Sequence, residues 1–425
     1  MGAAAAAPGT AQSSSRIPPD PGLSLGDGGC FRLKSRWELV RGLLVFWLCS
    51  SPRLVQSLLS ASRWVLGRRL WGSLLRLTLY GQFVAGETTQ EIEATLQRLR
   101  VLGVRPLLAV PIEEDVGPLL ALPPREGWYE GNTRSILACL DLSARGGRNP
   151  MMQLKVTALM GAQLCVSIGA VGPRLRGEPR DENQHLWESL RRLNSVAERA
   201  VERGVRVLVD AEYTYVNPAL SLVTLAMMVA WNRERPWVWN TYQAYLKDSF
   251  ERLPYDAALA ESLGVCFGVK LVRGAYLDKE KILARNGGYP VPVHPNWEAT
   301  NESYQRCLDF ALGKAAESGG RFELIVATHN EESVTHAVER MAQLGIVRDS
   351  GPVSFGQLLG MCDQVSLALG QAGYSIYKSI PYGPVEDVIP YLVRRAQENR
   401  SVLQGIRKER DLLRQELRRR LLRRP

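Results

Sequence analysis

Short apolar or β-branched runs alternate with longer helical patterns from about residue 150 onward, and this alternation restricts the possible folds more than any other feature. Seven runs are predicted as strands: Leu154–Ala158, Val205–Asp210, Trp237–Asn240, Cys266–Val272, Leu324–Ala327, Val353–Phe355 and Ser375–Tyr377. The helical patterns between them cover residues 186–203, 216–231, 256–262, 298–318, 331–344 and 385–399. Alternation of this kind is typical of a parallel sheet.

A parallel sheet is built either as an open, doubly wound sheet or as a closed (β/α)8 barrel. No GxGxxG segment follows the first predicted strand, so a dinucleotide site of the doubly wound type has no support. Polar side chains instead stand at the C-terminal end of one strand after another: Lys155, Asp210, Gln243, Arg273 and His329. Active sites of (β/α)8 barrels are assembled at those ends, so we predict an α/β fold with a TIM-like barrel.

The segments outside the barrel differ from it in composition. Residues 1–35 are rich in Ala, Gly, Ser and Pro and are predicted to be disordered, with basic residues that resemble a mitochondrial import segment. Residues 36–130 are predicted as a helical arm, basic and amphipathic up to about residue 110, that either packs on the barrel or lies on a membrane surface. Residues 131–402 would form the barrel. The apolar stretch Gly42–Cys49 is much shorter than the roughly 20 residues of a membrane-spanning helix.

The formal net charge of +10 is concentrated near the two ends of the chain. Residues 403–425 are predicted as a basic amphipathic tail, with Leu413, Leu417 and Leu421 at four-residue spacing. Such a helix either lies on anionic lipid or is a terminal helix that is solvated or packed against the barrel. No aromatic residues are interleaved with its cations, so we expect no nucleic-acid partner. The seven scattered cysteines, without a CxxC pair, and the four histidines lead us to expect neither a disulfide framework nor a metal site.

The run from Tyr391 to Asn399 places Arg394, Arg395 and Glu398 within one helical turn of each other, with Tyr391 on the same side. Two guanidiniums can hold and orient one carboxylate, and Glu398 can fix their geometry. The pattern therefore favours an anion clamp, although a solvated basic stripe would have the same spacing.

Two further segments suit a flavin. Lys270 and Arg273 stand beside the small residues Gly274 and Ala275, where cations could meet a flavin ring edge and a pyrophosphate. A general phosphate site or a salt-bridged turn would look the same. Thr328 and His329 end another strand, where the histidine could bond a phosphate or a ribose, or be structural.

Taken in order, these segments resemble the proline dehydrogenase family, over roughly residues 77 to 400. The resemblance is carried by eight motifs: LKVTAL with Lys155, DAEYT (210–214), NTYQAY with Gln243, KLVRGAY (270–276), ATHN (327–330), QLLGM (357–361), PYG (381–383) and YLVRRAQEN (391–399). It implies a distorted (β/α)8 barrel that binds FAD, oxidises the ring C–N bond of an imino acid and passes electrons to a membrane quinone. It also implies a mitochondrial location on the matrix side of the inner membrane, with peripheral membrane contact as an open alternative.

Carried over by position, the resemblance implies that Arg394, Arg395 and Lys155 hold the substrate carboxylate, with Glu398 pairing with the arginines. Tyr391 would pack over the ring and Asp210 would lie behind the substrate, which makes Asp210, Lys155 and Tyr391 the catalytic candidates. The residues implied to meet FAD are Gln243, Lys270, Arg273, Gly274, Ala275, Thr328 and His329. Lys270 replaces an arginine of bacterial members, and Leu277 replaces a tryptophan often found there.

One departure from the family pattern bears on the substrate. Members that prefer proline have a tyrosine two residues before the Pro of the PYG-type motif, and this chain has Ser379 there. A serine opens space and offers a polar group, which suits a ring with a hydroxyl on carbon 4. The predicted substrate is therefore trans-4-hydroxy-L-proline, oxidised to 1-pyrroline-3-hydroxy-5-carboxylate. The alternatives are an L-proline dehydrogenase and, more remotely, a non-enzymatic basic barrel that binds membrane or RNA.

Overall fold

The computed structural model describes residues 25–26, 28–51, 54–55, 57, 62–110, 112, 125–171, 180–349, 351–401 and 403–422. Of residues 62–63, 170–171, 180–182, 396–401 and 403–406 it describes the backbone alone. Most of the predicted import segment lies outside the described residues. The last part of this segment is described. Gly29–Leu33 form a 3-10 helix, η1, in which Cys30 and Phe31 are buried. Disorder up to residue 35 is therefore wrong for residues 29–35, which an apolar anchor holds against the fold.

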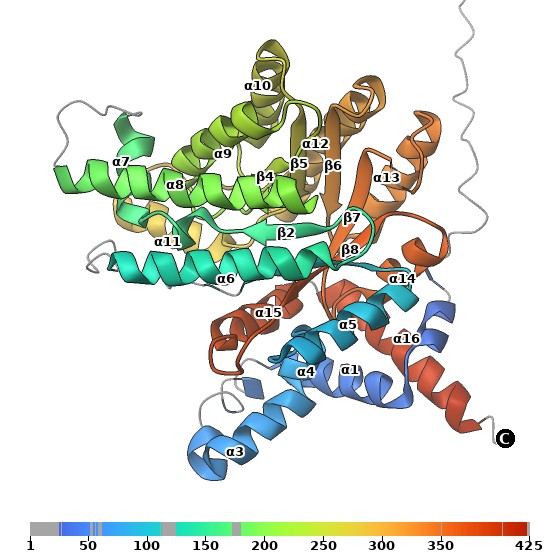
Figure 1. Ribbon diagram of the computed structural model, residues 1–425. Coiled ribbons are helices and arrows are strands. Elements are labelled where there is room, and N and C mark those ends of the chain that lie inside the picture. Colours follow the sequence, from blue (N-terminus) through green and yellow to red (C-terminus); the bar gives the residue numbers. More distant parts are fainter. Residues whose placement is uncertain are drawn as a thin grey trace, which may run out of the picture.

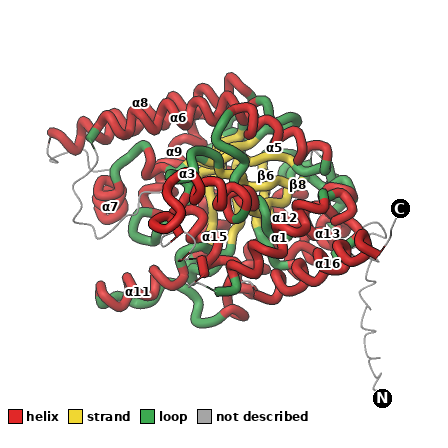
Figure 2. Tube along the Cα trace, turned by 90° about the horizontal axis from the view of Figure 1, so that it is seen from below, coloured by secondary structure: helices red, strands yellow, loops and turns green. Residues whose placement is uncertain are grey.

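Eight parallel strands close into one barrel in chain order, which confirms the predicted architecture (Figures 1 and 2). The strands are β1 (Arg105–Ala109), β2 (Met151–Leu154), β3 (Arg206–Val209), β4 (Val238–Gln243), β5 (Phe267–Val272), β6 (Phe322–Ala327), β7 (Val353–Leu358) and β8 (Ile376–Pro381). The helices that follow β1 to β7 are α6 (Glu126–Ala144), α7 (Ala162–Val171), α8 (Arg180–Arg203), α9 (Asn217–Trp231), α10 (Ser249–Ser262), α11 (Leu277–Gly287), α12 (Trp297–Glu317), α13 (Glu331–Gln343) and α14 (Asp363–Gln371).

Two sequence predictions need correction. Strand β1 lies inside the range predicted as a helical arm. Its sequence gives little β signal, because it has only five residues, contains Pro106 and lacks β-branched side chains. Strand β2 ends at Leu154, where the prediction has a strand begin, and Val156–Ala158 form a 3-10 helix, η3. The unbranched Met151 and Met152 gave no β signal, and the chain turns away from the barrel directly after Lys155.

The barrel interior is built in layers, an apolar one below a polar one. Side chains from six strands form the apolar floor: Leu107, Met151, Leu208, Trp239, Ile325 and Tyr377. Because inward-facing positions recur every two residues, the next layer toward the C-terminal ends contains Gln153, Asp210, Lys270 and Ser379. The packed floor closes the barrel, so chemistry is confined to its C-terminal mouth.

The arm consists of α1 (Arg36–Cys49), α3 (Ser62–Leu77), α4 (Leu79–Phe83) and α5 (Thr89–Val101), and it lies with α15 (Ile389–Ser401) below the barrel in Figure 1. Three hydrogen bonds attach α4 and the residue pair after it to the C-terminal ends of β7 and β8. They join Tyr80 Oη to Gly383 O (2.8 Å), Gln82 Nε2 to Gly360 O (2.8 Å) and Ala85 N to Pro381 O (2.9 Å). The arm is thus placed beside the mouth of the barrel.

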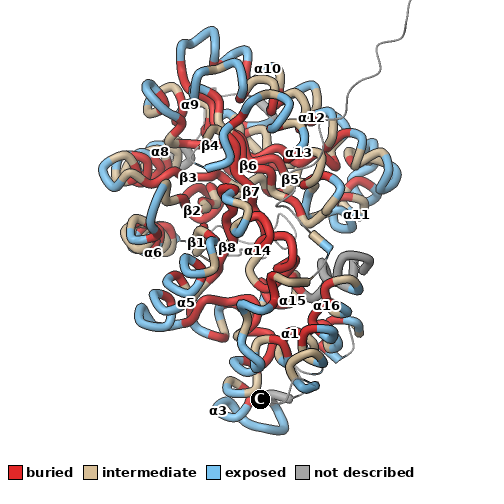
Figure 3. Tube along the Cα trace, turned by 90° about the vertical axis from the view of Figure 1, so that its right-hand side faces the viewer, coloured by how far each residue is buried: buried red, intermediate tan, exposed pale blue. Residues whose placement is uncertain are grey.

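The tail forms the helix α16 (Leu403–Leu422), whose apolar side is used for packing (Figure 3). Leu412 and Leu413 are buried, and α16 packs against α1 and η1. Arg420 donates hydrogen bonds to the carbonyl oxygens of Lys34 (2.7 Å) and Phe31 (3.0 Å). Of the two alternatives for this helix, the structure therefore shows packing against the folded chain.

A buried charge cluster, which we call the junction cluster, joins η1, α14, β8 and α16. It consists of Lys34, Asp363, Lys378 and Glu409. Lys34 pairs with Asp363, and Lys378 Nζ lies 2.8 Å from Asp363 Oδ1. Glu409 accepts hydrogen bonds from the backbone N–H groups of Cys362 (2.8 Å) and Asp363 (3.0 Å). Burial of paired charges makes the fit of η1 and α16 specific, because any displacement would leave a charge unpaired.

All seven cysteines are buried free thiols.

No helix in the described part of the chain combines the length and the apolar character needed to span a bilayer.

Candidate active site

A chain of hydrogen bonds crosses the barrel mouth from β8 to β5. Ser379 Oγ donates to Gln153 Oε1 (2.5 Å), and Gln153 Nε2 donates to Asp210 Oδ1 (3.1 Å). The same oxygen of Asp210 accepts from Lys270 Nζ at 2.6 Å. The structure thus brings together Asp210, Lys270 and Ser379, which come from three strands, and adds Gln153 as the link between them.

A second polar group lies beside the first, around the buried Glu212. Its carboxylate accepts hydrogen bonds from Thr157 Oγ1 at 2.8 and 2.9 Å. Burial raises the pKa of Glu212, and the nearby ammonium of Lys155 and the bonds from Thr157 act in the opposite direction. Gln243, the last residue of β4, donates to Glu212 O at 2.9 Å. Lys155, through its charge, and Gln243, through its hydrogen bond to the backbone carbonyl, are therefore both neighbours of Glu212 at the mouth.

Arg273, directly after β5, is the centre of a third group. Its guanidinium donates to Thr328 Oγ1, to Asn301 Oδ1 (3.0 Å) and to Ser333 Oγ (2.9 Å), and its Cζ lies 4.2 Å from the centre of the Tyr304 ring. Burial lowers the pKa of Arg273 from its ordinary value. A rigidly held, largely desolvated cation of this kind is suited to binding a phosphate.

The residues after Arg273 allow a close approach of the backbone. Gly274 has φ +136°, and a Cβ atom there would lie 2.2 Å from the Tyr245 ring. Only glycine fits at this position. Gly274 and Ala275 are both exposed, so their backbone is accessible at the mouth.

His329 follows β6 and contributes an unused polar atom. Its Nδ1 is buried and has no hydrogen-bond partner among the residues that the structure describes. Burial first, and then the charges of Lys378 and Arg395, lower the pKa of His329 to about 3, so the ring is neutral at neutral pH. A buried, neutral ring nitrogen without a protein partner points to a polar ligand atom at this place.

Helix α15 carries the predicted anion clamp. The Cζ atoms of Arg394 and Arg395 lie 5.9 and 4.8 Å from the centre of the Tyr391 ring, and Arg395 is buried. Arg394 Nη1 lies 3.5 Å from Tyr276 Oη, in the loop between β5 and α11. Arg394 is thus on the side of α15 that faces the mouth, and Arg395 is near enough to His329 for its charge to lower the pKa of that ring. The side chain of Glu398 lies outside the described residues.

Sequence reasoning missed Gln153, Glu212 and Tyr276. Gln153 is two residues before Lys155, and correct placement of β2 would have put it on the inner face by alternation. Glu212 and Tyr276 lie inside the DAEYT and KLVRGAY motifs, but nothing local distinguishes a buried carboxylate or phenol from an exposed one.

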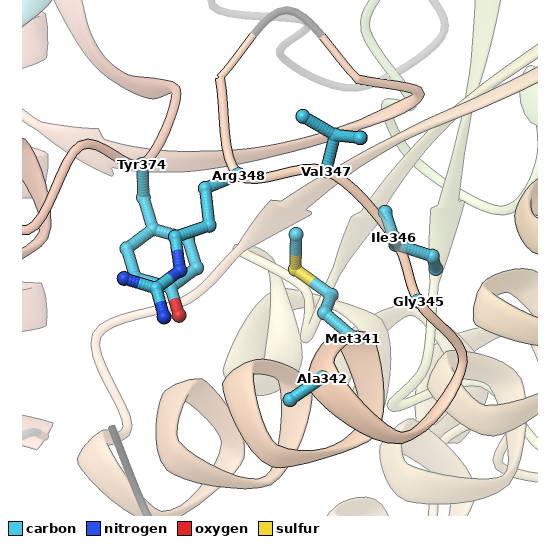
Figure 4. A pocket seen from close by; sticks show the side chains of 7 residues that line it. All are labelled: Met341, Ala342, Gly345, Ile346, Val347, Arg348 and Tyr374. Carbon is cyan, nitrogen blue, oxygen red and sulfur yellow. The ribbon is translucent and has the colours of Figure 1, made fainter. Parts of the chain in front are cut away.

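A pocket of about 300 Å3 lies elsewhere, in the segments that lead into β7 and β8 (Figure 4). It is lined by Met341, Ala342, Gly345, Ile346, Val347, Arg348 and Tyr374. These segments are at the N-terminal ends of the strands, opposite the polar mouth, where barrel residues contribute to stability. We therefore do not assign this pocket to the active site.

Comparison with protein families matches residues 130–408 to the proline dehydrogenase model. The chain is 58% identical to the hydroxyproline dehydrogenase of Xenopus laevis, covering 94% of this chain and 90% of that protein. It is 53% identical to the hydroxyproline dehydrogenase of Homo sapiens, covering 93% of each chain. It is 33% identical to the mitochondrial proline dehydrogenase 1 of Homo sapiens, covering 98% of this chain and 93% of that protein.

Among solved structures, proline utilization A from Bdellovibrio bacteriovorus shares the fold, with a TM-score of 0.67 and 22% identity over 88% of this chain. The present chain spans 37% of the length of that protein.

Proposed function

Because this chain belongs to the proline dehydrogenase family, we propose that it is a flavin-dependent dehydrogenase that oxidises trans-4-hydroxy-L-proline to 1-pyrroline-3-hydroxy-5-carboxylate. The substrate assignment depends on one observation, which is that the hydroxyl of Ser379 lies in the polar layer of the barrel mouth. Relatives named for hydroxyproline are 52–58% identical to the chain, against 32–33% for those named for proline. The alternative of a non-enzymatic barrel has no support, because all of these relatives are named as dehydrogenases.

The substrate carboxylate is proposed to bind Arg394, Arg395 and Lys155. The family resemblance supports these roles, as does the position of Arg394 on the mouth side of α15. Tyr391, below both guanidiniums, would pack over the ring, and Glu398 would pair with them. Charge-assisted bonds to a planar carboxylate fix its orientation as well as its position.

The cofactor is proposed to be FAD, held by Gln243, Lys270, Arg273, Gly274, Ala275, Thr328 and His329. The Nδ1 of His329, which has no partner among the described side chains, and the rigid cation of Arg273 fit a large anionic ligand with several hydrogen-bonding atoms. Lys270 is held by Asp210, so it would present its charge to the flavin from a fixed position. When bound, FAD supplies the two-electron acceptor.

The side chains of the protein orient the reaction. A clamped carboxylate holds the ring carbon next to nitrogen at one place, so its hydride is lost in an effectively unimolecular step. The nitrogen loses a proton, and a C=N double bond remains. Asp210 accepts hydrogen bonds from Gln153 and Lys270 on Oδ1, and this network would hold it in place behind the substrate. The substrate amine is proposed to lose its proton before oxidation.

We further propose that a quinone accepts the electrons, at the matrix side of the inner mitochondrial membrane. The relatives named mitochondrial support the organelle. Trp37, Val40, Leu44 and Trp47 form one exposed apolar stripe on α1, and residues 28–77 contain nine Lys or Arg against one Glu. An apolar stripe within a basic segment fits an anionic lipid surface better than the tail helix does, because Leu412 and Leu413 of α16 are buried in packing.

The membrane surface is tested with vesicles of phosphatidylcholine, with and without phosphatidylserine. Replacing Trp37 and Trp47 by serine should weaken co-sedimentation with the anionic vesicles several-fold. Trp187→Ser, which replaces a still more exposed tryptophan on α8, is the matched control and should bind like the wild type. Equal binding by all three proteins would refute this surface.

The activity is tested on the purified protein. We expect a flavin absorbance spectrum and, with a soluble quinone as acceptor, a higher kcat/KM for trans-4-hydroxy-L-proline than for L-proline. A preference for L-proline would assign the chain to the alternative activity. Absence of both flavin and turnover would contradict the proposed function altogether.

A further inference from the structure

Gln153 connects the hydroxyl of Ser379 to the ion pair of Asp210 and Lys270. It lies on β2, next to β3 and separated from β8 by β1, and its amide bridges Asp210 after β3 and Ser379 of β8. The two distances are 2.5 Å from Oε1 to Ser379 Oγ and 3.1 Å from Nε2 to Asp210 Oδ1. Gln153 and Ser379 are both partly accessible, so the link lies at the mouth and not in the closed floor.

The direction of each hydrogen bond in this chain follows from the Asp210 carboxylate. Asp210 pairs with the Lys270 ammonium, and an ionised carboxylate has no hydrogen to donate. The amide of Gln153 must therefore turn its NH2 group toward Asp210, which leaves Oε1 facing Ser379. Ser379 has a single hydroxyl hydrogen, and Gln153 Oε1 takes it. What Ser379 presents to the mouth is the lone pairs of its oxygen.

We propose that Gln153 is a specificity-determining positioning residue, which holds Ser379 as a hydrogen-bond acceptor so that the pocket selects ring substituents that donate a hydrogen bond. The inference rests on the proposed function, in which the 4-hydroxyl of the ring lies against Ser379. A hydroxyl meets this requirement. A 4-oxo group offers only lone pairs, so it would face the oxygen of Ser379 without a hydrogen between them.

A purely structural role for Gln153 would have a different consequence. The barrel floor below it is closed by apolar side chains from six strands, and Gln153 is not part of that cluster. If Gln153 only linked β2 to β3 structurally, its loss would weaken the binding of every ligand of the site in parallel. If it sets the hydrogen-bond direction of Ser379, its loss should affect donor and acceptor ligands oppositely.

The test uses the FAD-loaded full-length enzyme and Gln153→Leu, which has a similar size and no polar atoms. In the variant, Ser379 becomes free to rotate and donate. We expect KM for trans-4-hydroxy-L-proline to rise roughly 10- to 100-fold. Competitive inhibition by 4-oxo-L-proline should become several-fold tighter. Gln343→Leu, the same change on the exposed end of α13, is the matched control and should match the wild type for both compounds.

A double-mutant cycle with Ser379→Ala checks the pathway. Because Gln153 acts through Ser379, Gln153→Leu should have little further effect on the ratio of the two affinities once the hydroxyl is gone. Suppose that Gln153→Leu weakens the binding of hydroxyproline and of 4-oxoproline in parallel, while the wild type prefers hydroxyproline to L-proline. The inference is then wrong and the proposed function stands. If the wild type prefers L-proline, the proposed substrate fails and this inference fails with it. Flavin absorbance and thermal unfolding verify that each variant is folded.

Discussion

Ser379, at the barrel mouth, is the side chain that we propose selects between two rings that differ by a single hydroxyl. Its Cα is paired in register with Leu107 of β1 and Leu358 of β7, so the strand holds it at a defined depth below the rim. A larger side chain at this depth would occupy the space in which we place the 4-hydroxyl.

Ser379→Tyr should therefore lower kcat/KM for trans-4-hydroxy-L-proline sharply and affect L-proline far less. The expected change in preference is about 10- to 1000-fold, from one lost hydrogen bond and a steric overlap. Steady-state kinetics with both substrates measures it. Ser379→Ala, which removes the hydroxyl without adding bulk, separates the two causes. Parallel loss of both substrates in Ser379→Tyr would mean that the serine does not face the ring.

Arg395 is the more deeply buried of the two clamp residues, at 3% exposure. Arg395→Met should raise the substrate KM by orders of magnitude while FAD remains bound, and Arg394→Met should act in the same direction. Loss of a charge-assisted bond to a buried carboxylate costs about 2–5 kcal/mol, or roughly 30- to several-thousand-fold. Arg134→Met, on the exposed side of α6, is the control. Unchanged KM in both clamp variants would rule out the clamp.

At the scale of elements, α16 illustrates how a helix that resembles a surface-binding tail becomes part of the fold. Leu413 is 1% exposed, and an added Cβ on Gly42 of α1 would lie 3.2 Å from its Cδ1. The helices approach closely because α1 has a glycine where they meet. Leu413 of α16 is therefore covered by α1.

Leu413→Ala should lower the free energy of unfolding by about 2–5 kcal/mol, because a buried leucine leaves a cavity in a close-packed contact. Chemical denaturation monitored by circular dichroism measures the change. Leu421→Ala, at 63% exposure on the same helix, should change it by less than about 1 kcal/mol. Similar effects of the two substitutions would show that α16 is not packed as described.

At the scale of the whole molecule, we expect the junction cluster to make stability depend on pH. Burial and the neighbouring Asp363 carboxylate raise the pKa of Glu409 to about 7, against 4.5 as the ordinary value. Between these values the native protein binds a proton that the unfolded chain does not. The contribution of Glu409 to stability is therefore greatest below pH 4.5 and decreases as the pH rises through 7.

Glu409→Gln should remove this contribution, so that the difference in unfolding free energy between variant and wild type changes across pH 5–8 by on the order of 2–3 kcal/mol. The wild type should lose stability relative to the variant as the pH rises. Urea unfolding at a series of pH values provides the measurement. Glu261→Gln, an exposed glutamate on α10, should give a parallel curve to the wild type. A constant difference between Glu409→Gln and wild type would contradict the assigned titration.

Much of this molecule follows from local patterns. Strand–helix alternation predicted the barrel, and seven of the eight strands coincide with or adjoin a predicted run. The exception, β1, is short and contains Pro106, and so lacks the signal on which such predictions depend. The positions of Asp210, Gln243, Arg273 and His329 at or just beyond strand ends were predicted because the end of an apolar run is visible in contiguous residues.

What the sequence by itself determined is the type of fold, the polar residues at the barrel mouth and the departure at Ser379, because periodicity and motifs are properties of neighbouring residues. Only the tertiary structure decided which of these groups meet. Ser379 and Gln153 are 226 positions apart, and Lys34 and Asp363 are 329 apart. Such contacts depend on closure of the barrel, on strand register and on the packing of α16, all of which are set by the packing of the whole chain at once.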